Sequence, residues 1–95
     1  MGEKRADPAR FEFDELKSRA NKLKHGIDFA DAQALWHDKG LVEIRARSSA
    51  EPRFVVVGRI GNRHWSAVIT CRGEAVRLIS VRRSRTGEVE LYGRE

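Results

Sequence analysis

The stretch RFVVVGRIGNRHWSAVITCRGEAVRLISV, Arg53–Val81, decides the fold of this chain. It consists of three runs rich in β-branched and aromatic residues, separated by the pairs Gly61-Asn62 and Gly73-Glu74. Two-residue links with glycine in the first central position are typical of type II′ hairpin turns. Strands joined by such turns must be antiparallel neighbours. The stretch therefore predicts three adjacent strands: Arg53–Ile60, His64–Arg72 and Ala75–Val81.

The residues on either side of this stretch extend the pattern. Leu41–Arg47 reads as a further strand, joined to Arg53 by the polar connection Ser48–Pro52. After Val81 the chain becomes polar, and Ser84–Tyr92 is expected to form a last helix. The sheet should therefore have four antiparallel strands followed by a C-terminal helix.

Two helices are expected before the strands. Asp14 is placed to cap the first, which should end at Gly26, and Asp28 is placed to cap the second, which should end near Asp38-Lys39-Gly40. Helical spacing assigns an inward apolar stripe to each. In the first helix the stripe is Leu16, Ala20, Leu23 and Ile27, and in the second it is Phe29, Ala32, Leu35 and Trp36.

Together these elements predict an α+β fold, with two N-terminal helices and a C-terminal helix packed on a four-stranded antiparallel sheet. A chain of 95 residues is long enough for one modest core. Residues 1–10 are polar and without periodicity, which predicts a flexible leader, and 11–95 should form a single domain.

Composition limits the classes of function. Nineteen Lys and Arg against 14 Asp and Glu give a formal charge of +5 and favour an anionic partner. No apolar run is long enough to span a bilayer and no signal-peptide core is present, so the chain is expected to be cytoplasmic. The single cysteine, Cys71, is expected to be a small buried residue.

Sequence motifs give no support for a metal or a cofactor. His25, His37 and His64 are far apart, and neither a glycine-rich phosphate loop nor a G-x-S-x-G motif occurs. Arginine is instead abundant along the predicted strands, and its planar fork suits phosphate. Strict alternation on the last strand would place Arg77 on the same face as Val81.

An ordered set of residues, spread roughly over 11–92, resembles the BrnT family of type II toxin-antitoxin systems, whose members look like RelE-type ribonucleases. The residues that carry the resemblance are Asp14, Lys17, Asn21, Lys24-His25-Gly26, Phe29, Glu51, Arg53, Ile79-Ser80, Arg82-Arg83, Glu88 and Tyr92. The resemblance implies a RelE-like fold and a metal-independent endoribonuclease that inhibits translation, in which the 2′-hydroxyl of the RNA attacks. It also implies a cognate antitoxin, a ribbon-helix-helix DNA-binding protein, in a heterotetramer of two toxins and two antitoxins.

Chemistry and resemblance together nominate the site. Arg53, Arg77, Arg82 and Arg83 are the expected ligands of the phosphate and its transition state. Glu51 is a candidate base, although it can equally be the partner of a nearby arginine in a salt bridge.

The remaining candidates have structural alternatives. Lys24 and His25 lie at the end of the first helix, where His25 can transfer a proton or simply bond to a carbonyl. Tyr92 can donate a proton, stack on a base or anchor the last helix. Trp36 and Trp65 are expected in the core.

Two other classes of function remain open from the residues alone. One is a non-catalytic nucleic-acid-binding module that uses the same basic sheet. The other is a protein-interaction domain whose cations meet an acidic partner, and a solvated, salt-bridged surface would explain the same arginines without any ligand.

Overall fold

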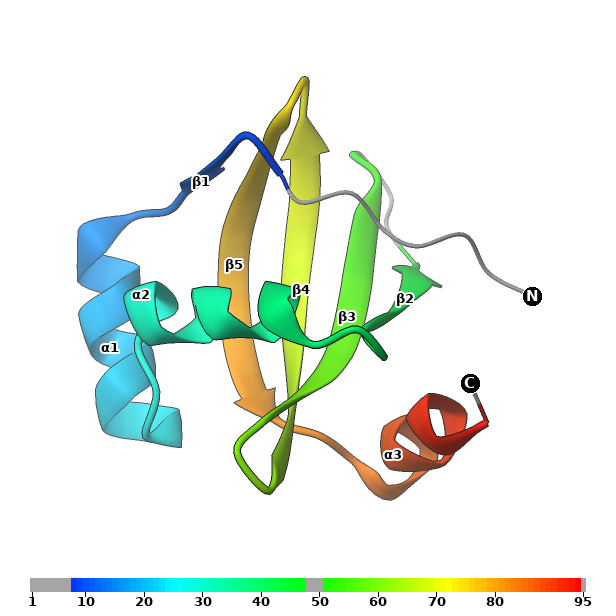
Figure 1. The fold of residues 1–95 in the computed structure, drawn as a ribbon. Coiled ribbons are helices and arrows are strands. Elements are labelled where there is room, and N and C mark those ends of the chain that lie inside the picture. The colour runs from blue at the N-terminus through cyan, green and yellow to red at the C-terminus, as the bar shows by residue number, and fades with distance from the viewer. Residues whose placement is uncertain (1–7, 48–50, 95) are drawn as a thin grey trace.

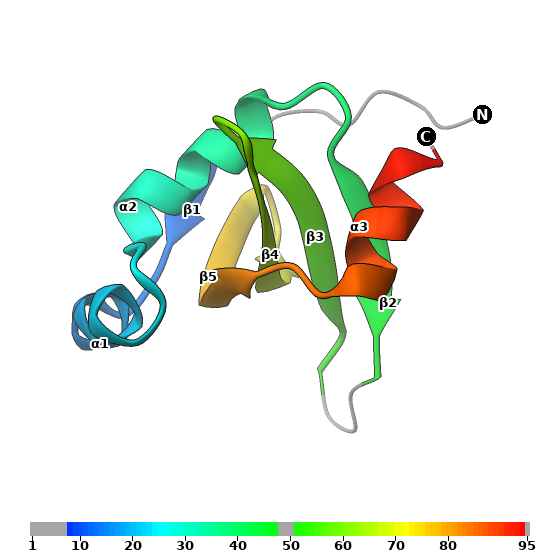
Figure 2. The same ribbon diagram turned by 90° about the horizontal axis from the view of Figure 1, so that it is seen from below.

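The computed structural model describes residues 8–47 and 51–94, shown in Figure 1 and, turned by 90°, in Figure 2. The elements in chain order are β1 (Arg10–Glu12), α1 (Glu15–His25), α2 (Phe29–Ala32), the 3₁₀ helix η1 (Gln33–His37), β2 (Val42–Ala46), β3 (Arg53–Ile60), β4 (Arg63–Arg72), β5 (Ala75–Arg83) and α3 (Thr86–Gly93). Helices α1, α2 and η1 lie together, whereas α3 lies apart from them, on the side of β2 and β3.

The strands form one sheet in the order β1-β5-β4-β3-β2. The α+β class is confirmed, but the sheet is five-stranded and mixed, because β1 pairs in parallel with β5. Three residues are too few to show a strand period, so β1 could not be predicted from its residues. Arg10 thus belongs to a strand although it was assigned to the leader, whose residues 1–7 lie outside the described residues.

Both predicted hairpin turns are confirmed. β3 pairs with β4 up to Ile60 opposite Arg63, and β4 pairs with β5 up to Arg72 opposite Ala75. Gly61 has φ of 64° and Gly73 has φ of 59°, and no other described residue of either link has positive φ. This combination fits the type II′ turn, where only the first central residue needs positive φ.

The core lies between α2, η1 and one face of the sheet. The predicted apolar side of the second helix is fully confirmed, although this segment is a short α-helix continued by a 3₁₀ helix. Trp36 and Trp65 are both core residues, as expected, and Phe11 of β1 packs edge-on against Trp36 with 5.0 Å between ring centroids. The helices, the strands and the loop after α1 together contribute the buried core side chains, which are Ile27, Phe29, Ala32, Leu35, Trp36, Val56, Trp65, Ala67, Ile69, Val76, Leu78 and Val81.

The stripe predicted for the first helix is wrong at three of its four positions, and Ile27, just after α1, is its one buried member. Leu16 is 73% exposed and Leu23 is 91% exposed, whereas Ser18 and Asn21 are buried. The polar side faces inward because it satisfies backbone groups, and the hydroxyl of Ser18 accepts a hydrogen bond of 2.9 Å from the N–H of Phe29.

Asn21 explains why α1 is fixed in this orientation. Its side-chain amide donates to the carbonyl of Val81 (2.9 Å) and its oxygen accepts from the Val81 N–H (3.1 Å). The same amide also donates to the carbonyl of Ile27 (2.8 Å). Asn21 therefore takes the place of a neighbouring strand at the edge of β5 beyond the short β1.

A β-bulge changes which side chains of β5 lie on each face of the sheet. Val68 pairs with Ser80, but the next residue, Ile69, pairs with Leu78, so Ile79 is an extra residue on β5. Leu78 and Val81 can then both enter the core. The prediction that Arg77 shares a face with Val81 was wrong, because the extra residue breaks strict alternation between them.

Cys71 also departs from its prediction. It lies one residue before the end of β4, close to the Gly73 turn, and its side chain is exposed. The apolar run that contains it extends beyond the region covered by the helices.

Candidate nucleic-acid interface

The face of the sheet opposite the core, here called the outer face, carries three of the four nominated arginines. The strand register assigns to it Arg53, Val55, Val57, Ser66, Val68, Thr70, Arg77, Ser80 and Arg82. With strict alternation Arg77 and Arg82 would lie on opposite faces, because they are five positions apart. The bulge at Ile79 brings both to the outer face.

Arg53, Thr70 and Arg77 form a row across three strands. Thr70 pairs with Arg77, and Arg53 lies beside Thr70 on the other strand, because Phe54 pairs with Ile69. Strands about 4.8 Å apart place the Cα atoms of Arg53 and Arg77 about 10 Å from each other. Two long side chains can converge on one phosphate across this spacing.

The row is cationic at its two ends, whereas Thr70 between them is buried. Arg53 is exposed and Arg77 is half-buried, and no carboxylate of the described residues forms an ion pair with either. The hydroxyl of Thr70 donates to the carbonyl of Pro52 (2.9 Å), which fixes the chain just before Arg53. Glu51, the candidate base, is exposed two residues before Arg53.

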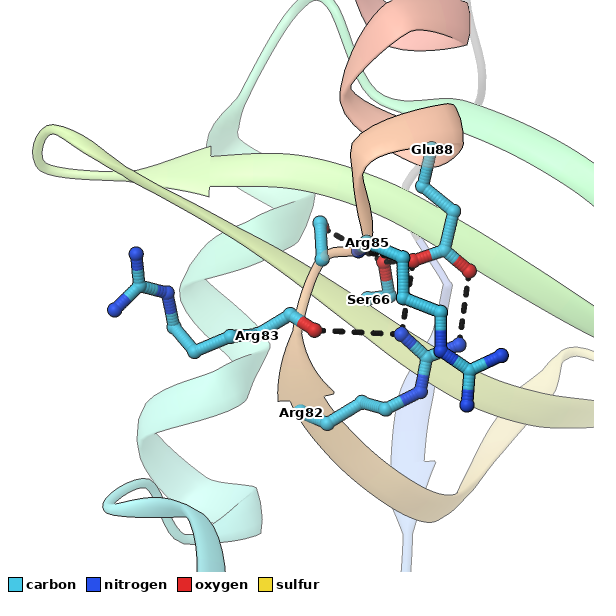
Figure 3. Close-up of polar contacts among 6 residues, drawn as sticks. Ser66, Arg82, Arg83, Arg85 and Glu88 are labelled. Carbon is cyan, nitrogen blue, oxygen red and sulfur yellow. Dashed lines mark hydrogen bonds and ion pairs between the residues drawn. The ribbon is translucent and has the colours of Figure 1, made fainter.

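Arg82 is held by Glu88, as Figure 3 shows. Nη1 and Nη2 of Arg82 each donate to one carboxylate oxygen of Glu88 at 2.8 Å, a bidentate pair with side chains 22% and 17% exposed. The hydroxyl of Ser66 (2.8 Å) and the N–H of Arg85 (2.9 Å) donate to the same carboxylate. Glu88 therefore attaches the start of α3 to the outer face and caps that helix.

The electrostatics of this pair follow from its geometry. The hydrogen bonds from Arg82, with those from Arg85 and Ser66, lower the pKa of Glu88 to about 2 even though burial opposes the shift. The pKa of Arg82 is raised, chiefly by the same hydrogen bonds. Glu88 is thus a carboxylate at neutral pH, and the charge of Arg82 is already matched.

Tyr92 anchors the other end of α3. Its hydroxyl donates to Asp38 at 2.8 Å, and the same carboxylate accepts from the N–H groups of Arg59 (2.7 Å) and Gly40 (2.8 Å). Burial and the bond to Asp38 raise the pKa of Tyr92. Burial would also raise the pKa of Asp38, but the bonds from Arg59, Gly40 and Tyr92 together lower it. Tyr92 is consequently a weaker acid than a free tyrosine.

His64, to which sequence reasoning assigned no role, packs edge-on against Tyr92. The ring centroids are 5.0 Å apart and the planes meet at 80°. An open pocket of about 400 Å³ lies alongside, lined in part by His37, Arg59 and Tyr92.

Arg83, Lys24 and His25 lie away from the row. Arg83 points away from Glu88 in Figure 3, and its guanidinium lies 5.6 Å from the ring centroid of Trp65, a core residue. His25 is one turn beyond Asn21 on α1, and Arg83 is two residues beyond Val81 on β5. Because Asn21 bonds to Val81 and the two elements run in the same direction in Figure 1, these cations gather at the lower end of β5.

A family model described as "Ribonuclease toxin, BrnT, of type II toxin-antitoxin system" matches residues 13–88. This match covers most of the chain and includes the three arginines of the outer face. The chain belongs to the BrnT family. It is therefore a ribonuclease toxin whose natural partner is a protein antitoxin, and the resemblance seen in the sequence is confirmed. No curated protein matched the chain.

The sequence analysis included Glu88 in the BrnT resemblance but did not predict its structural role, which is to bind Arg82 and to cap α3. Its position three residues after Arg85 is the spacing of a helix cap, which was a usable signal. The bidentate contact with Arg82 had no such signal, because it depends on where α3 returns to the sheet.

Two further findings concern ligands and membranes. Among residues 8–47 and 51–94, His, Cys, Asp and Glu side chains do not gather in groups of three or more that could hold a metal ion. Within the same part of the chain, no helix has the length and apolarity needed to cross a bilayer.

Proposed function

We propose that this BrnT family member is a metal-independent endoribonuclease of the cytoplasm that cuts RNA on its outer face and so inhibits translation. The row Arg53–Thr70–Arg77 carries the proposal, because its two guanidinium groups, one exposed and one half-buried, form no ion pair with another described residue. Arginine forks bind phosphate and stabilise the charge that develops in its transition state.

The chemistry assigned to the row needs no enzyme nucleophile. The RNA 2′-oxygen forms a bond to phosphorus while the bond from phosphorus to the 5′-oxygen breaks, leaving a 2′,3′-cyclic phosphate and a 5′-hydroxyl. Glu51 takes the proton of the 2′-hydroxyl, and the departing 5′-oxygen gains a proton from solvent. Arg53 and Arg77 stabilise the anionic phosphorane between these steps.

Arg82 and Tyr92 have a positioning role in this proposal. Both are already engaged, Arg82 by Glu88 and Tyr92 by Asp38. Through these contacts they fix α3 at the border of the outer face. A carboxylate as strongly bound as Glu88 is a poor base, so Glu88 is not assigned that task.

Lys24, His25 and Arg83 are the rival location for the same reaction. This group includes a histidine, the side chain most often used for proton transfer in catalysis. It lacks a carboxylate comparable to Glu51, so we assign it to contacts with the RNA strand outside the point of cleavage.

The family resemblance supports a finer proposal for the partner. We propose a ribbon-helix-helix antitoxin that binds DNA and forms a heterotetramer of two toxins and two antitoxins. Size measurement of the co-expressed complex tests the stoichiometry.

The test of the site compares a variant of the row, a control variant and a variant of the rival location. The three variants remove similar amounts of positive charge. In Arg53→Ala/Arg77→Ala, RNA cleavage should fall by at least about 10³-fold, because each aimed guanidinium contributes about 10² or more. The control Arg45→Ala/Arg63→Ala removes two exposed arginines whose strand partners, Phe54 and Ile60, pack toward the core. It should cleave RNA within a few-fold of wild type, and added chelator should not reduce the rate.

Other results would redirect the assignment. Greater loss in Lys24→Ala/His25→Ala/Arg83→Ala than in the row variant would move the reaction to the end of β5. Retention of RNA at unchanged length by the wild-type protein would replace the nuclease with a binding module.

A further inference from the structure

Helix α1 presents an apolar stripe to solvent that the fold does not use. Leu16 and Leu23 are 73% and 91% exposed, and Ala20, between them, is also exposed. These residues are spaced at i, i+4 and i+7, so they form one line on the side of the helix opposite Asn21. The stripe therefore points away from the sheet.

Cations flank this stripe on both sides. Lys17 and Lys24 lie along one border and Arg19 along the other, with Lys22 beyond it. All are exposed, and none forms an ion pair with another residue of the described ranges. The surface is thus a line of leucine between rows of unmatched positive charge.

The charge decides which occupant fits. A second copy of this chain would place cations against cations, which is unfavourable. RNA would match the charge but would leave two leucines in contact with phosphate and sugar, whereas an apolar protein surface would remove them from water. A helix or extended segment with apolar residues bordered by Asp and Glu satisfies both features.

We propose that the α1 stripe is the docking surface for an acidic, amphipathic segment of the protein antitoxin. This inference rests on the proposed function as a toxin. It locates the partner on α1, apart from the Arg53–Thr70–Arg77 row of the outer face. The stripe thus lies apart from the proposed point of cleavage, although Lys24 at its border is also proposed to contact the RNA strand.

The test uses the product of the reading frame adjacent to the toxin gene as the antitoxin probe. Leu16→Ser/Leu23→Ser should weaken its binding by at least about 100-fold, since two apolar side chains no longer leave water. The matched control is Leu91→Ser on α3, which removes another exposed leucine on the other side of the molecule in Figures 1 and 2. It should bind the antitoxin like wild type.

Three readouts separate the outcomes. Both variants should keep the wild-type unfolding midpoint and RNA cleavage rate, and Lys17→Glu/Arg19→Glu should also lose antitoxin binding. Unchanged antitoxin binding by Leu16→Ser/Leu23→Ser would overturn the inference. A variant that binds the antitoxin normally but loses RNA binding or self-association would overturn it as well. Absence of RNA cleavage by wild type would refute the proposed function, while the binding comparison would still decide the docking surface.

Discussion

At the scale of single residues, the polar side chains with the most partners support the fold. Glu88 joins Arg82, Ser66 and the N–H of Arg85, and Asn21 joins β5 to the loop after α1. Asn21 pairs buried backbone groups, and Glu88 pairs the buried hydroxyl of Ser66 and the partly buried guanidinium of Arg82. Removal of such a residue leaves those groups unpaired, which costs more than the contact itself.

Glu88→Gln should lower the free energy of unfolding at pH 7 by about 1 to 2 kcal/mol, a figure reduced for solvent screening of the pair. The pKa of Glu88 is lowered from 4.5 to about 2 on folding, so its contribution is complete above pH 4.5 and disappears as pH falls toward 2. Urea titrations between pH 7 and pH 2.5 measure this. The wild-type and variant curves should converge in acid, whereas Glu90→Gln, at an exposed position of α3, should follow wild type throughout.

Asn21→Ala should destabilise the protein by about 2 to 4 kcal/mol, because the backbone groups of Val81 and the carbonyl of Ile27 lose their partner. The exposed turn residue Asn62 provides the control, and Asn62→Ala should change stability by about 0.5 kcal/mol or less. Thermal unfolding compares the two. Equal effects would show that Asn21 does not hold α1 to β5.

At the scale of elements, close approach between a helix and a strand fixes how the layers meet. Gly58 lies in β3 directly beneath η1, and a Cβ there would meet Leu41 Cδ1 at 2.8 Å and Leu35 Cδ2 at 3.1 Å. Leu35 is fully buried and has little room to move. The absence of a side chain at Gly58 therefore permits η1 to seal the core.

Gly58→Ala should destabilise the protein by about 1 to 3 kcal/mol through overpacking. Gly87, in the first turn of α3, has open space around it, so Gly87→Ala should be neutral or stabilise by up to about 1 kcal/mol. Chemical denaturation of both variants tests the contrast. A neutral Gly58→Ala would mean that η1 can shift outward freely.

At the scale of the whole molecule, cations occupy two separate regions, and one of these regions also exposes apolar side chains. The outer face carries the arginine row, while α1 carries the leucine stripe with its flanking cations on the side turned away from the sheet. A net charge of +5 spread in this way attracts RNA over a broad surface. Binding should therefore depend strongly on salt.

The affinity of wild type for a non-cleavable 2′-deoxy oligonucleotide should fall steeply with salt concentration. In Arg53→Ala/Arg77→Ala the plot of log K against log salt should become less steep. The magnitude of its slope should fall by about 1.4, because each phosphate contact on a single strand contributes about 0.7. Fluorescence anisotropy at several salt concentrations measures it. An unchanged slope would show that neither arginine contacts phosphate.

Local sequence features were sufficient for much of this fold. The links Gly61-Asn62 and Gly73-Glu74 predicted the two hairpins, and Asp14, Gly26 and Asp28 marked helix ends. The apolar side of the second helix was also assigned correctly. The ordered BrnT residues also indicated the family. Each of these features acts through neighbours within a few positions, or through composition, so the chain displays it without folding.

Contacts between distant segments determined the rest. β1 is too short to show a period, and the inward side of α1 was chosen by Asn21 reaching Val81, 60 positions away, against the preference of its leucines for burial. The bulge at Ile79 arises from core packing of both Leu78 and Val81, and it alone brings Arg77 and Arg82 to one face. Burial and hydrogen bonding between remote residues outweigh local periodicity at these points, so only the tertiary structure could decide which cations are neighbours.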